Sequence, residues 1–534
     1  MSTDATTLLL RRRGLRGALL EERIGALRRL SRRPTVQANV ALWTIVICSA
    51  LIVLTAAARP TFLSATTRAH YFPAWMAGPL GGLAPGLANS SSLKSFFSAA
   101  IVLTFGCYLV AFTRATYLRP RNVLIAILAV HAIFLLAPPL ALTDVFNYFN
   151  YARMEVVHHL NPYTTIPALE PHNDPSFALS NWHGLLSPYG PLFTILTFAL
   201  APLSLGAFFW SFKVLLLVAD LGVVFLVWKC ATLLQRQPLA IRFGRPSVTS
   251  EASAPKSIGP LAAVILVAFN PIVLVWGLGG DHNDFLTIFF LLLGFYLLLR
   301  ARAAGLPGAQ ALGGLVRRGH RWLATETALD AAAGVSLVVA TGLKASAGIV
   351  IPIVLASLLR NRRRLLAVLG GMALAAVLAG IASVLAFGLH FPDLSLQGSV
   401  VTDLSIPNLL GLALGQGGET HMLHTLLNVA LVGTVVACCV WAWRREEPLA
   451  ASGWAMVALL VTLGWVLPWY VIWVLPLAAL AGSRRLRIAA LSIAVYLVLA
   501  WIPVTGEVLN ALHLHPGKTA VGRANHRTIQ SLLY

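Results

Sequence analysis

The sequence predicts an all-α, polytopic membrane protein with about 13 transmembrane helices, most of them close to 20 residues long. Hydrophobic residues make up 58% of the 534 residues and charged residues only 11%, whereas soluble globular chains carry about 25% charged residues. Such a chain cannot cover a surface exposed to water, so lipid must surround it. The formal charge of +21 does not indicate nucleic acid, because the basic residues lie in short clusters between apolar runs, which is typical of cytoplasmic loops.

The chain is expected to divide into three regions. Residues 1–37 form a basic arm, whose nine arginines between Arg11 and Arg33 we expect on the cytoplasmic face against anionic lipid. Residues 38–503 form the transmembrane bundle, and residues 504–534 form a tail on the outer face. Apolar runs suited to spanning the membrane are predicted at Ala38–Ala57, Phe96–Phe112, Val123–Leu142, Ala207–Val227, Pro260–Trp276, Phe285–Leu299, Leu365–Leu389, Leu426–Trp443, Ala450–Leu467, Tyr470–Ala481 and Ile488–Ile502.

Two further apolar segments need a different interpretation. Ala331–Leu359 looks like one long span, yet the arginines at both of its ends favour the cytoplasm. The chain must therefore enter the membrane and return, and a turn at 342–344 places Lys344 at the outer tip of a broken hairpin. Pro191–Gly206 is short. We expect this segment to be re-entrant or steeply tilted, because irregular backbone is tolerated at membrane depth where protein covers it.

The alternation of spans, with the N-terminus in the cytoplasm, places four loops outside the membrane. These loops are residues 142–190, 278–284, 390–425 and 468–469, and they hold one arginine and no lysine. This asymmetry is the one expected for outer loops. The sequence therefore predicts a multi-pass protein of the plasma membrane with its functional residues at the outer face.

Asp144 is the first candidate functional residue, because it comes directly after a predicted span. The aromatic residues that follow it, Phe146, Tyr148, Phe149 and Tyr151, are typical of an interfacial helix that lies flat on the bilayer. A carboxylate held at this boundary can act as a general base on a hydroxyl group. The alternative is that Asp144 only caps the helix, since aspartate is a favourable N-cap residue, and the two roles are compatible.

The second candidate group is the sequence GLGGDHNDF, a tight turn between two predicted spans. A turn explains the glycines and Asn283. It does not explain why Asp281, His282 and Asp284 lie together beside an apolar bundle. Ionisable residues in such a place are candidates for a functional site, so we expect at least one of the three to belong to it.

Lys344 at the predicted hairpin tip is the third candidate. No carboxylate lies near it in the sequence, and the point charge of a lysine is suited to binding a phosphate. The alternative is a lysine whose ammonium group extends to the membrane surface.

Aromatic and polar residues supply weaker candidates. Trp469 and Tyr470 fit either an outer aromatic belt or a surface on which a ring-shaped substrate stacks. Asp220, within a span, is expected to make a structural polar contact. A group of polar residues in the first outer loop is expected to provide substrate contacts or merely loop polarity: His158, His159, His172, Asn173, Asp174 and His183.

These motifs together resemble those of the type C glycosyltransferase superfamily. Within it, the chain looks most like the polyprenyl-phosphomannose-dependent α-1,6-mannosyltransferases of actinobacteria. The motifs occur in the family's order over roughly residues 142–480: TDVFNYFNYAR, then NPY at Asn161–Tyr163, SPYGPL, GGDHND, GLKASAG and PWYVIWVLPLAAL.

The resemblance implies roles for particular residues. Asp144 would be the catalytic base, and Lys344 and His282 would bind the donor phosphate. A further set would contact substrate: Asp281, Asn283, Asp284, Tyr148, Tyr163, Tyr189, Trp469 and Tyr470. Some relatives have two acids separated by one residue and use a divalent cation, but Val145 and Phe146 follow Asp144 here, so neither a metal site nor another cofactor is indicated.

The resemblance also implies an activity and partners. A hexose, expected to be mannose, would move with inversion from a polyprenyl-phosphate donor to a lipid-linked or cell-envelope glycan. A polytopic transporter or a flippase for lipids or glycolipids is the alternative. A transporter should have charges near the middle of the membrane and pseudo-symmetric halves, and the sequence shows neither.

Overall fold

The computed structural model describes residues 33–58, 73–84, 86, 92–140, 144–236, 258–304 and 326–533. The predicted basic arm therefore lies outside the described residues up to Arg32, as do Leu142, Thr143 and Tyr534. Within the described ranges the chain is helical and has no β-strand, which agrees with the predicted all-α class.

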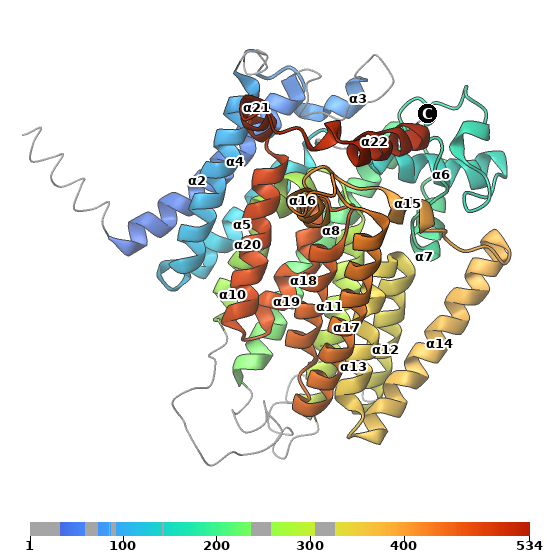
Figure 1. Cartoon of the computed structure of the whole chain (residues 1–534). Coiled ribbons are helices and arrows are strands. Elements are labelled where there is room, and N and C mark those ends of the chain that lie inside the picture. Colours follow the sequence, from blue (N-terminus) through green and yellow to red (C-terminus); the bar gives the residue numbers. More distant parts are fainter. Residues whose placement is uncertain are drawn as a thin grey trace, which may run out of the picture.

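The core of the structure is a bundle of roughly parallel and antiparallel helices (Figure 1). Large apolar side chains of these helices pack together in one continuous core. The helices are α2 (Pro34–Ala58), α4 (Leu93–Thr113), α5 (Pro120–Leu135), α8 (Leu205–Arg236), α10 (Pro260–Ala268), α11 (Asp284–Ala304), α12 (Glu326–Leu343), α13 (Val350–Leu358), α14 (Arg362–Phe387), α17 (His421–Arg445), α18 (Pro448–Thr462), α19 (Leu475–Leu480) and α20 (Arg484–Trp501).

Seven of these helices are long and apolar enough to cross a membrane, or eight if the bent pair of α20 and α21 (Pro503–Ala511) counts as one span. Four shorter apolar helices lie among them, at Pro120–Leu135, Ala345–Leu358, Pro448–Thr462 and Pro468–Leu480. Proline accounts for some of the interruptions, because it cannot donate a backbone hydrogen bond and restricts the residue before it. The multi-span fold is therefore confirmed, and the total of about 13 crossings, which follows from span length, stays a prediction.

The outer helices α14 and α17 show that lipid is the solvent of this bundle. Only 17% of the most apolar stretch of α14 and 11% of that of α17 are buried within the protein. Leu385, for example, is 83% exposed. Apolar helices of this length would not remain uncovered in water.

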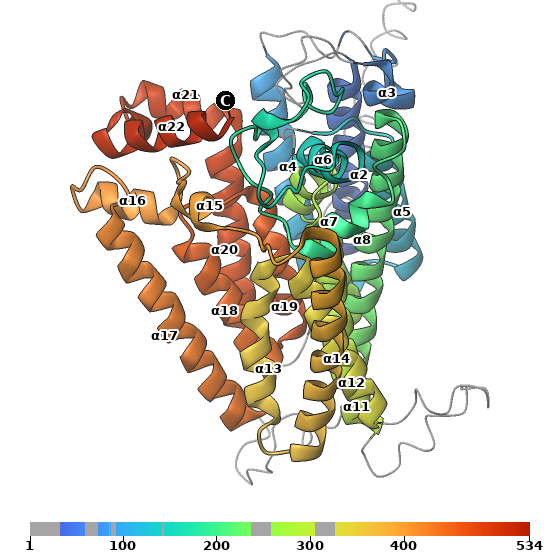
Figure 2. The same ribbon diagram turned by 90° about the vertical axis from the view of Figure 1, so that its right-hand side faces the viewer.

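The predicted break near Lys344 is confirmed. Helix α12 ends at Leu343, Lys344 is extended, and a short 3-10 helix, η8 (Ala345–Ile349), leads into α13. The guanidinium of Arg364, in the first turn of α14, lies 2.8 Å from the Asp330 carboxylate near the start of α12. The chain therefore returns to the end from which it came, as Figure 2 shows for α12, α13 and α14.

One end of the bundle is covered by short helices and loops. Both Figure 1 and Figure 2 show α6 (Asp144–His158), α15 (Ser395–Ser399), α16 (Ile406–Ala413), α21 and α22 (Ala520–Leu533) at this end, together with α3 (Ala74–Ala77). The predicted helix after Asp144 is present, but Phe146, Tyr148, Phe149 and Tyr151 are buried within the protein. Tyr148 and Phe149 pack against Phe193 of α7 (Pro191–Phe198) and against Phe208 and Phe212 of α8, so protein rather than lipid surrounds them.

The segment predicted to be re-entrant or tilted begins as α7 (Pro191–Phe198). Its eight residues rise about 12 Å, whereas the hydrocarbon core of a bilayer is about 30 Å thick. Helix α7 is therefore too short to cross, and the re-entrant interpretation is the one that its length favours.

Helices α12 and α14 cross in close contact at two glycines. A Cβ atom at Gly371 would overlap the carbonyl oxygen of Ala331, and one at Gly334 would overlap the carbonyl oxygen of Val368. Small residues that allow backbones to approach are a common means of helix association in membranes.

Gly371→Ala should destabilise the protein, because the added methyl group forces α12 and α14 apart. The expected loss is about 1–3 kcal/mol, measurable as a lower midpoint of thermal unfolding in detergent. Its neighbour Gly370 has open space around it. Gly370→Ala should therefore leave the midpoint unchanged or raise it slightly, and equal effects of the two changes would contradict the close contact.

Candidate active site

A cavity of about 610 Å³ lies at the covered end of the bundle. Its volume falls in the range of small-molecule sites, about 300–1,000 Å³. The wall combines polar and aromatic side chains with leucines, and it includes Asp144, Tyr148, Tyr151, Asn181, Trp182, Tyr189, Lys344, Ser346, Gln397, His424, Asn428, Leu431, Leu459, Leu463, Trp465, Trp469, Tyr470, Trp473 and Leu532. Asp144 and Lys344, which are 200 residues apart in the sequence, therefore face the same space.

Asp144 is the first residue of α6, and 21% of its side chain is exposed. Burial raises the pKa of its carboxyl group to about 6, Lys344 opposes this shift, Asp284 adds to it, and a hydrogen bond with Trp182 lowers the pKa. Its position in the first turn also places the negative charge at the positive end of the helix dipole. The carboxylate is thus a base whose pKa lies near neutral pH, which is suited to proton transfer.

His282 lies beside Asp144 and is completely buried. Its Nδ1 is 3.6 Å from Oδ2 of Asp144, and its ring stacks on that of Trp469 with 3.5 Å between the centroids. Burial holds the pKa of His282 well below its ordinary value, and Lys344 lowers it further. Burial and Lys344 therefore both oppose a positive charge on the imidazole, and its predicted contact with a donor phosphate stays a prediction. Neither ring nitrogen has a hydrogen-bond partner among the described residues.

Lys344 forms an ion pair with Asp284, whose two oxygens lie 2.8 and 2.9 Å from Nζ. The indole nitrogen of Trp473 donates a hydrogen bond of 2.5 Å to the same carboxylate. Lys344 also lies over the rings of Tyr470 and Trp473. No acidic residue lies near Lys344 in the sequence, but the fold brings Asp284, 60 residues away in the chain, next to it. Lys344 nevertheless lines the cavity, and 21% of its side chain is exposed.

None of the residues of the GGDHND turn, including His282 and Asp284, is part of the cavity wall. Asp281 is buried and lies 3.3 Å from Nζ of Lys213, and its φ of +56° is in the left-handed region that aspartate tolerates better than most residues. Asn283 is 3.5 Å from the hydroxyl group of Tyr148. Both residues support the wall from behind rather than face the cavity.

Tyr163 also lies outside the cavity wall. Its hydroxyl group donates to the carbonyl oxygen of Tyr189 and lies 2.9 Å from the hydroxyl of Thr194. It therefore holds Tyr189 in the wall. Asp220, for which a structural contact is predicted, pairs with His131 at 3.0 Å inside the bundle.

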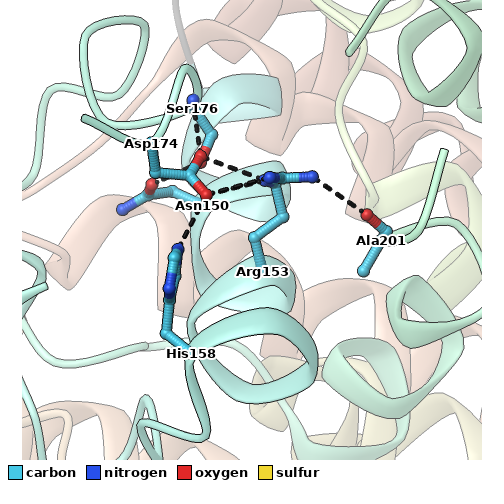
Figure 3. Close-up of polar contacts among 6 residues, drawn as sticks. All are labelled: Asn150, Arg153, His158, Asp174, Ser176 and Ala201. Carbon is cyan, nitrogen blue, oxygen red and sulfur yellow. Dashed lines mark hydrogen bonds and ion pairs between the residues drawn. The ribbon is translucent and has the colours of Figure 1, made fainter. Parts of the chain in front are cut away.

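The loop that follows α6 is fixed to this helix by a cluster around Asp174 (Figure 3). The Asp174 carboxylate accepts hydrogen bonds from Arg153, His158 and Ser176, and Arg153 also donates to the carbonyl oxygen of Ala201. Burial raises the pKa of Asp174, but these hydrogen bonds outweigh it and hold the pKa below its usual range. Two of the polar candidates of this loop, His158 and Asp174, thus anchor the segment that carries Trp182 and Tyr189.

His172 and His183 have a similar structural role. Both rings stack against that of Phe177, with centroid distances of 4.3 and 4.0 Å. Among the described residues no group of three or more His, Cys, Asp or Glu side chains is placed to hold a metal ion.

Several residues of the wall are absent from the sequence-based candidates. Trp182 and His424 are two of them, and Nδ1 of His424 lies 2.8 Å from the buried carboxylate of Glu419. Glu419 and His424 are polar residues just before a predicted span. The sequence does not show that His424 lines the cavity.

Helix α22 is the largest part of the wall that the sequence analysis does not predict. The sequence analysis predicts only a tail at residues 504–534. Ile529 and Leu532 of α22 line the cavity. The helix is held in place by hydrogen bonds from the Gly184 amide to Leu532 and from the Val401 amide to Asn525. Its apolar residues at helical spacing are the only signal in the sequence that this segment packs on the bundle.

The fold and this cavity define a polytopic α-helical membrane protein with a polar, aromatic-lined site at one end of its bundle. The comparison with known families is more specific. The chain belongs to the alpha-(1->6)-mannopyranosyltransferase family, whose N-terminal domain matches residues 63–360 and whose MptB C-terminal domain matches residues 402–519. The family resemblance read from the motifs is thereby confirmed.

Two curated relatives illustrate the similarity. Alpha-(1->6)-mannopyranosyltransferase A of Mycobacterium tuberculosis is 28% identical over 385 residues, which cover 67% of this chain and 65% of the relative. A probable alpha-(1->6)-mannopyranosyltransferase of Mycolicibacterium smegmatis is 26% identical over 393 residues, with the same coverage of 67% and 65%. The chain thus spans just under two thirds of the length of these relatives. No solved structure shows significant similarity to the chain.

Asp284→Ala should destabilise the protein, because it leaves the Lys344 ammonium and the Trp473 indole N–H without their acceptor. The expected loss is about 1–3 kcal/mol, measurable as a lower thermal midpoint in detergent. The double variant Asp284→Ala with Lys344→Met should lose less than the sum of the single variants, because the unpaired charge is removed with its partner. Strict additivity would show that the ion pair contributes nothing.

Proposed function

We propose that the chain transfers a mannosyl residue from a polyprenyl-phosphate donor to a mannoside acceptor of the cell envelope. The proposal rests on one observation above all: a base, Asp144, and a cation, Lys344, line the same cavity. The names of the family and of the relatives support mannose as the sugar. Tryptophan and tyrosine side chains in the same wall are suited to stack on a sugar ring.

The proposed reaction is a single displacement. The Asp144 carboxylate takes the proton of an acceptor hydroxyl group, whose oxygen attacks C1 of the donor sugar. The bond from C1 to the phosphate oxygen breaks, and its electron pair leaves with the polyprenyl phosphate. Attack from the side opposite to the leaving group inverts the configuration at C1. Lys344 stabilises the negative charge of the phosphate as it leaves.

The refined roles of the neighbouring residues follow from their contacts. His282, buried 3.6 Å from Asp144, supports the base. Asp284 and Trp473 hold Lys344 toward the cavity. Tyr148, Tyr189, Trp469 and Tyr470 are the aromatic substrate contacts in the cavity wall. Three residues act through their partners rather than on substrate. Asp281 contacts Lys213, Asn283 contacts Tyr148, and Tyr163 contacts Tyr189.

The proposed orientation places this cavity at the outer face of the plasma membrane and the N-terminus in the cytoplasm. Five arginines that line a second cavity, Arg302, Arg360, Arg364, Arg484 and Arg485, gather at the opposite end of the bundle. Basic residues favour the cytoplasmic side. The transporter alternative gains no support, because the candidate substrate contacts lie at one end of the bundle rather than near its middle.

Asp144→Asn should lower the rate of transfer from polyprenyl-phosphomannose to a mannoside acceptor by about 100- to 10,000-fold, the usual contribution of a general base. The assay uses the purified full chain, with wild type measured in parallel. Asp393 is an exposed aspartate in a loop outside the cavity wall. Asp393→Asn should keep the wild-type rate, and full turnover by Asp144→Asn would remove Asp144 as the base.

The transfer rate should fall as the pH drops below about 6, because Asp144 accepts a proton only as the carboxylate and its pKa is raised to about 6. Lys344 lowers this pKa and Asp284 raises it. Lys344→Met should therefore move the acid limb of the pH–rate profile to higher pH, and Asp284→Asn should move it to lower pH. The midpoint of the acid limb can be measured for each variant even where its maximal rate is reduced. Shifts in the same direction would contradict the assignment.

A further inference from the structure

A second cavity, of about 620 Å³, lies at the other end of the bundle. Helix α17 shows that the two cavities are at opposite ends: His424 near its start lines the first, and Trp441 near its end lines the second. The hairpin shows the same, since Lys344 faces the first cavity and Arg360 the second. Nothing in the proposed reaction uses this second cavity.

The wall of this cavity has an excess of positive charge. Five arginines and two glutamates line it: Arg302, Arg360, Arg364, Arg484, Arg485, Glu446 and Glu447. Arg364 is neutralised by the buried Asp330 at 2.8 Å, and Arg360 lies 3.8 Å from Glu446. Arg484 and Arg485 are exposed, and no acid among the described residues lies within ion-pair distance of either.

Three helices add positive potential because they begin at this cavity. The residues at their N-caps, Asn361 of α14, Glu447 of α18 and Ser483 of α20, all line the wall. The N-terminus of a helix carries a partial positive charge and presents free amide groups, both of which favour anions. The arginine side chains and the helix ends thus act on the same space.

The rest of the wall is apolar. Side chains from five helices form it: Leu234, Phe295, Leu298, Leu299, Trp441, Leu449 and Leu480. A small free anion would leave this apolar surface without a contact. A basic pocket between helices whose remaining wall is apolar is typical of sites for the headgroups of anionic lipids.

We infer that this second cavity binds the phosphate headgroup of an anionic phospholipid from the adjoining leaflet. The phosphate lies against Arg484, Arg485 and the N-terminus of α20, and the upper part of the acyl chains lies against the leucines and Trp441. The bound lipid connects α11, α14, α18 and α20, so it stabilises the folded bundle by mass action. This inference does not depend on the proposed transferase activity.

The test is thermal unfolding of the purified full chain in detergent during titration with three ligands. Phosphatidylglycerol should raise the unfolding midpoint in a saturable manner, whereas phosphatidylcholine should not. Inorganic phosphate at the same concentration should also leave the midpoint unchanged. An equal increase with phosphatidylcholine, or with phosphate alone, would overturn the assignment to an anionic lipid.

A pair of double variants tests the site itself. Arg484→Gln with Arg485→Gln should weaken the effect of phosphatidylglycerol by about tenfold or more, because each arginine near the headgroup contributes about 1 kcal/mol. Arg444→Gln with Arg445→Gln removes the same charge from exposed positions at the end of α17 that do not line the cavity. This control should bind the lipid as the wild type does, and equal losses in both variants would overturn the site.

A single variant in another segment of the wall, between α13 and α14, provides an independent check. Arg360 is half-exposed, so Arg360→Gln is expected to fold. It should also weaken the phosphatidylglycerol effect, while its midpoint without lipid stays close to that of the wild type. Unchanged lipid binding in both Arg360→Gln and the Arg484 and Arg485 double variant would overturn the inference.

Discussion

The ion pair between Lys344 and Asp284 is the interaction on which the geometry of the active-site cavity depends. It joins three segments that are far apart in the chain: the break between α12 and α13, the start of α11, and Trp473. A lysine and an aspartate at the edge of an apolar bundle are each costly alone, and they become tolerable when they are paired and hydrogen-bonded. The pair fixes where the hairpin tip can lie, and with it the distance from the cation to Asp144.

The polar residues near this ion pair form two groups: one lies behind the cavity wall, and the other lies at or beside Asp144 and Lys344. Asp281, Asn283 and Tyr163 have partners behind the wall, although Oδ2 of Asp281 and Nδ2 of Asn283 have none among the described residues. Asp144 and Lys344 keep one side open to the cavity, and His282 keeps two unsatisfied nitrogens beside Asp144. The open sides of Asp144 and Lys344 are therefore the places where a substrate would supply further contacts.

Much of this arrangement can be predicted from the sequence, because the membrane limits where charges can lie. Asp144 stands out since it follows an apolar run, and the break at Lys344 follows from arginines at both ends of one apolar segment. The pairing of Lys344 with Asp284 cannot be predicted in this way, because it depends on how α11 and α12 pack. Likewise, the aromatic side chains after Asp144 suit a lipid surface as well as a protein interior, and only the packing of α7 and α8 decides between them. The helical spacing of the apolar residues in α22 indicates a helix with one apolar face, but the surface on which it packs depends on contacts with loops that the sequence does not show.

Leucines of α17 and α18 line the first cavity together with Asp144 and Lys344. This combination of apolar and charged side chains has a consequence for the proposed donor. A carrier with a long hydrocarbon tail would not have to be extracted from the bilayer in order to react. Its tail would stay among lipids while its headgroup reached the carboxylate, and the spent carrier would diffuse away sideways. Encounter would then be a two-dimensional search, governed by the amount of carrier per area of membrane rather than by its concentration in water.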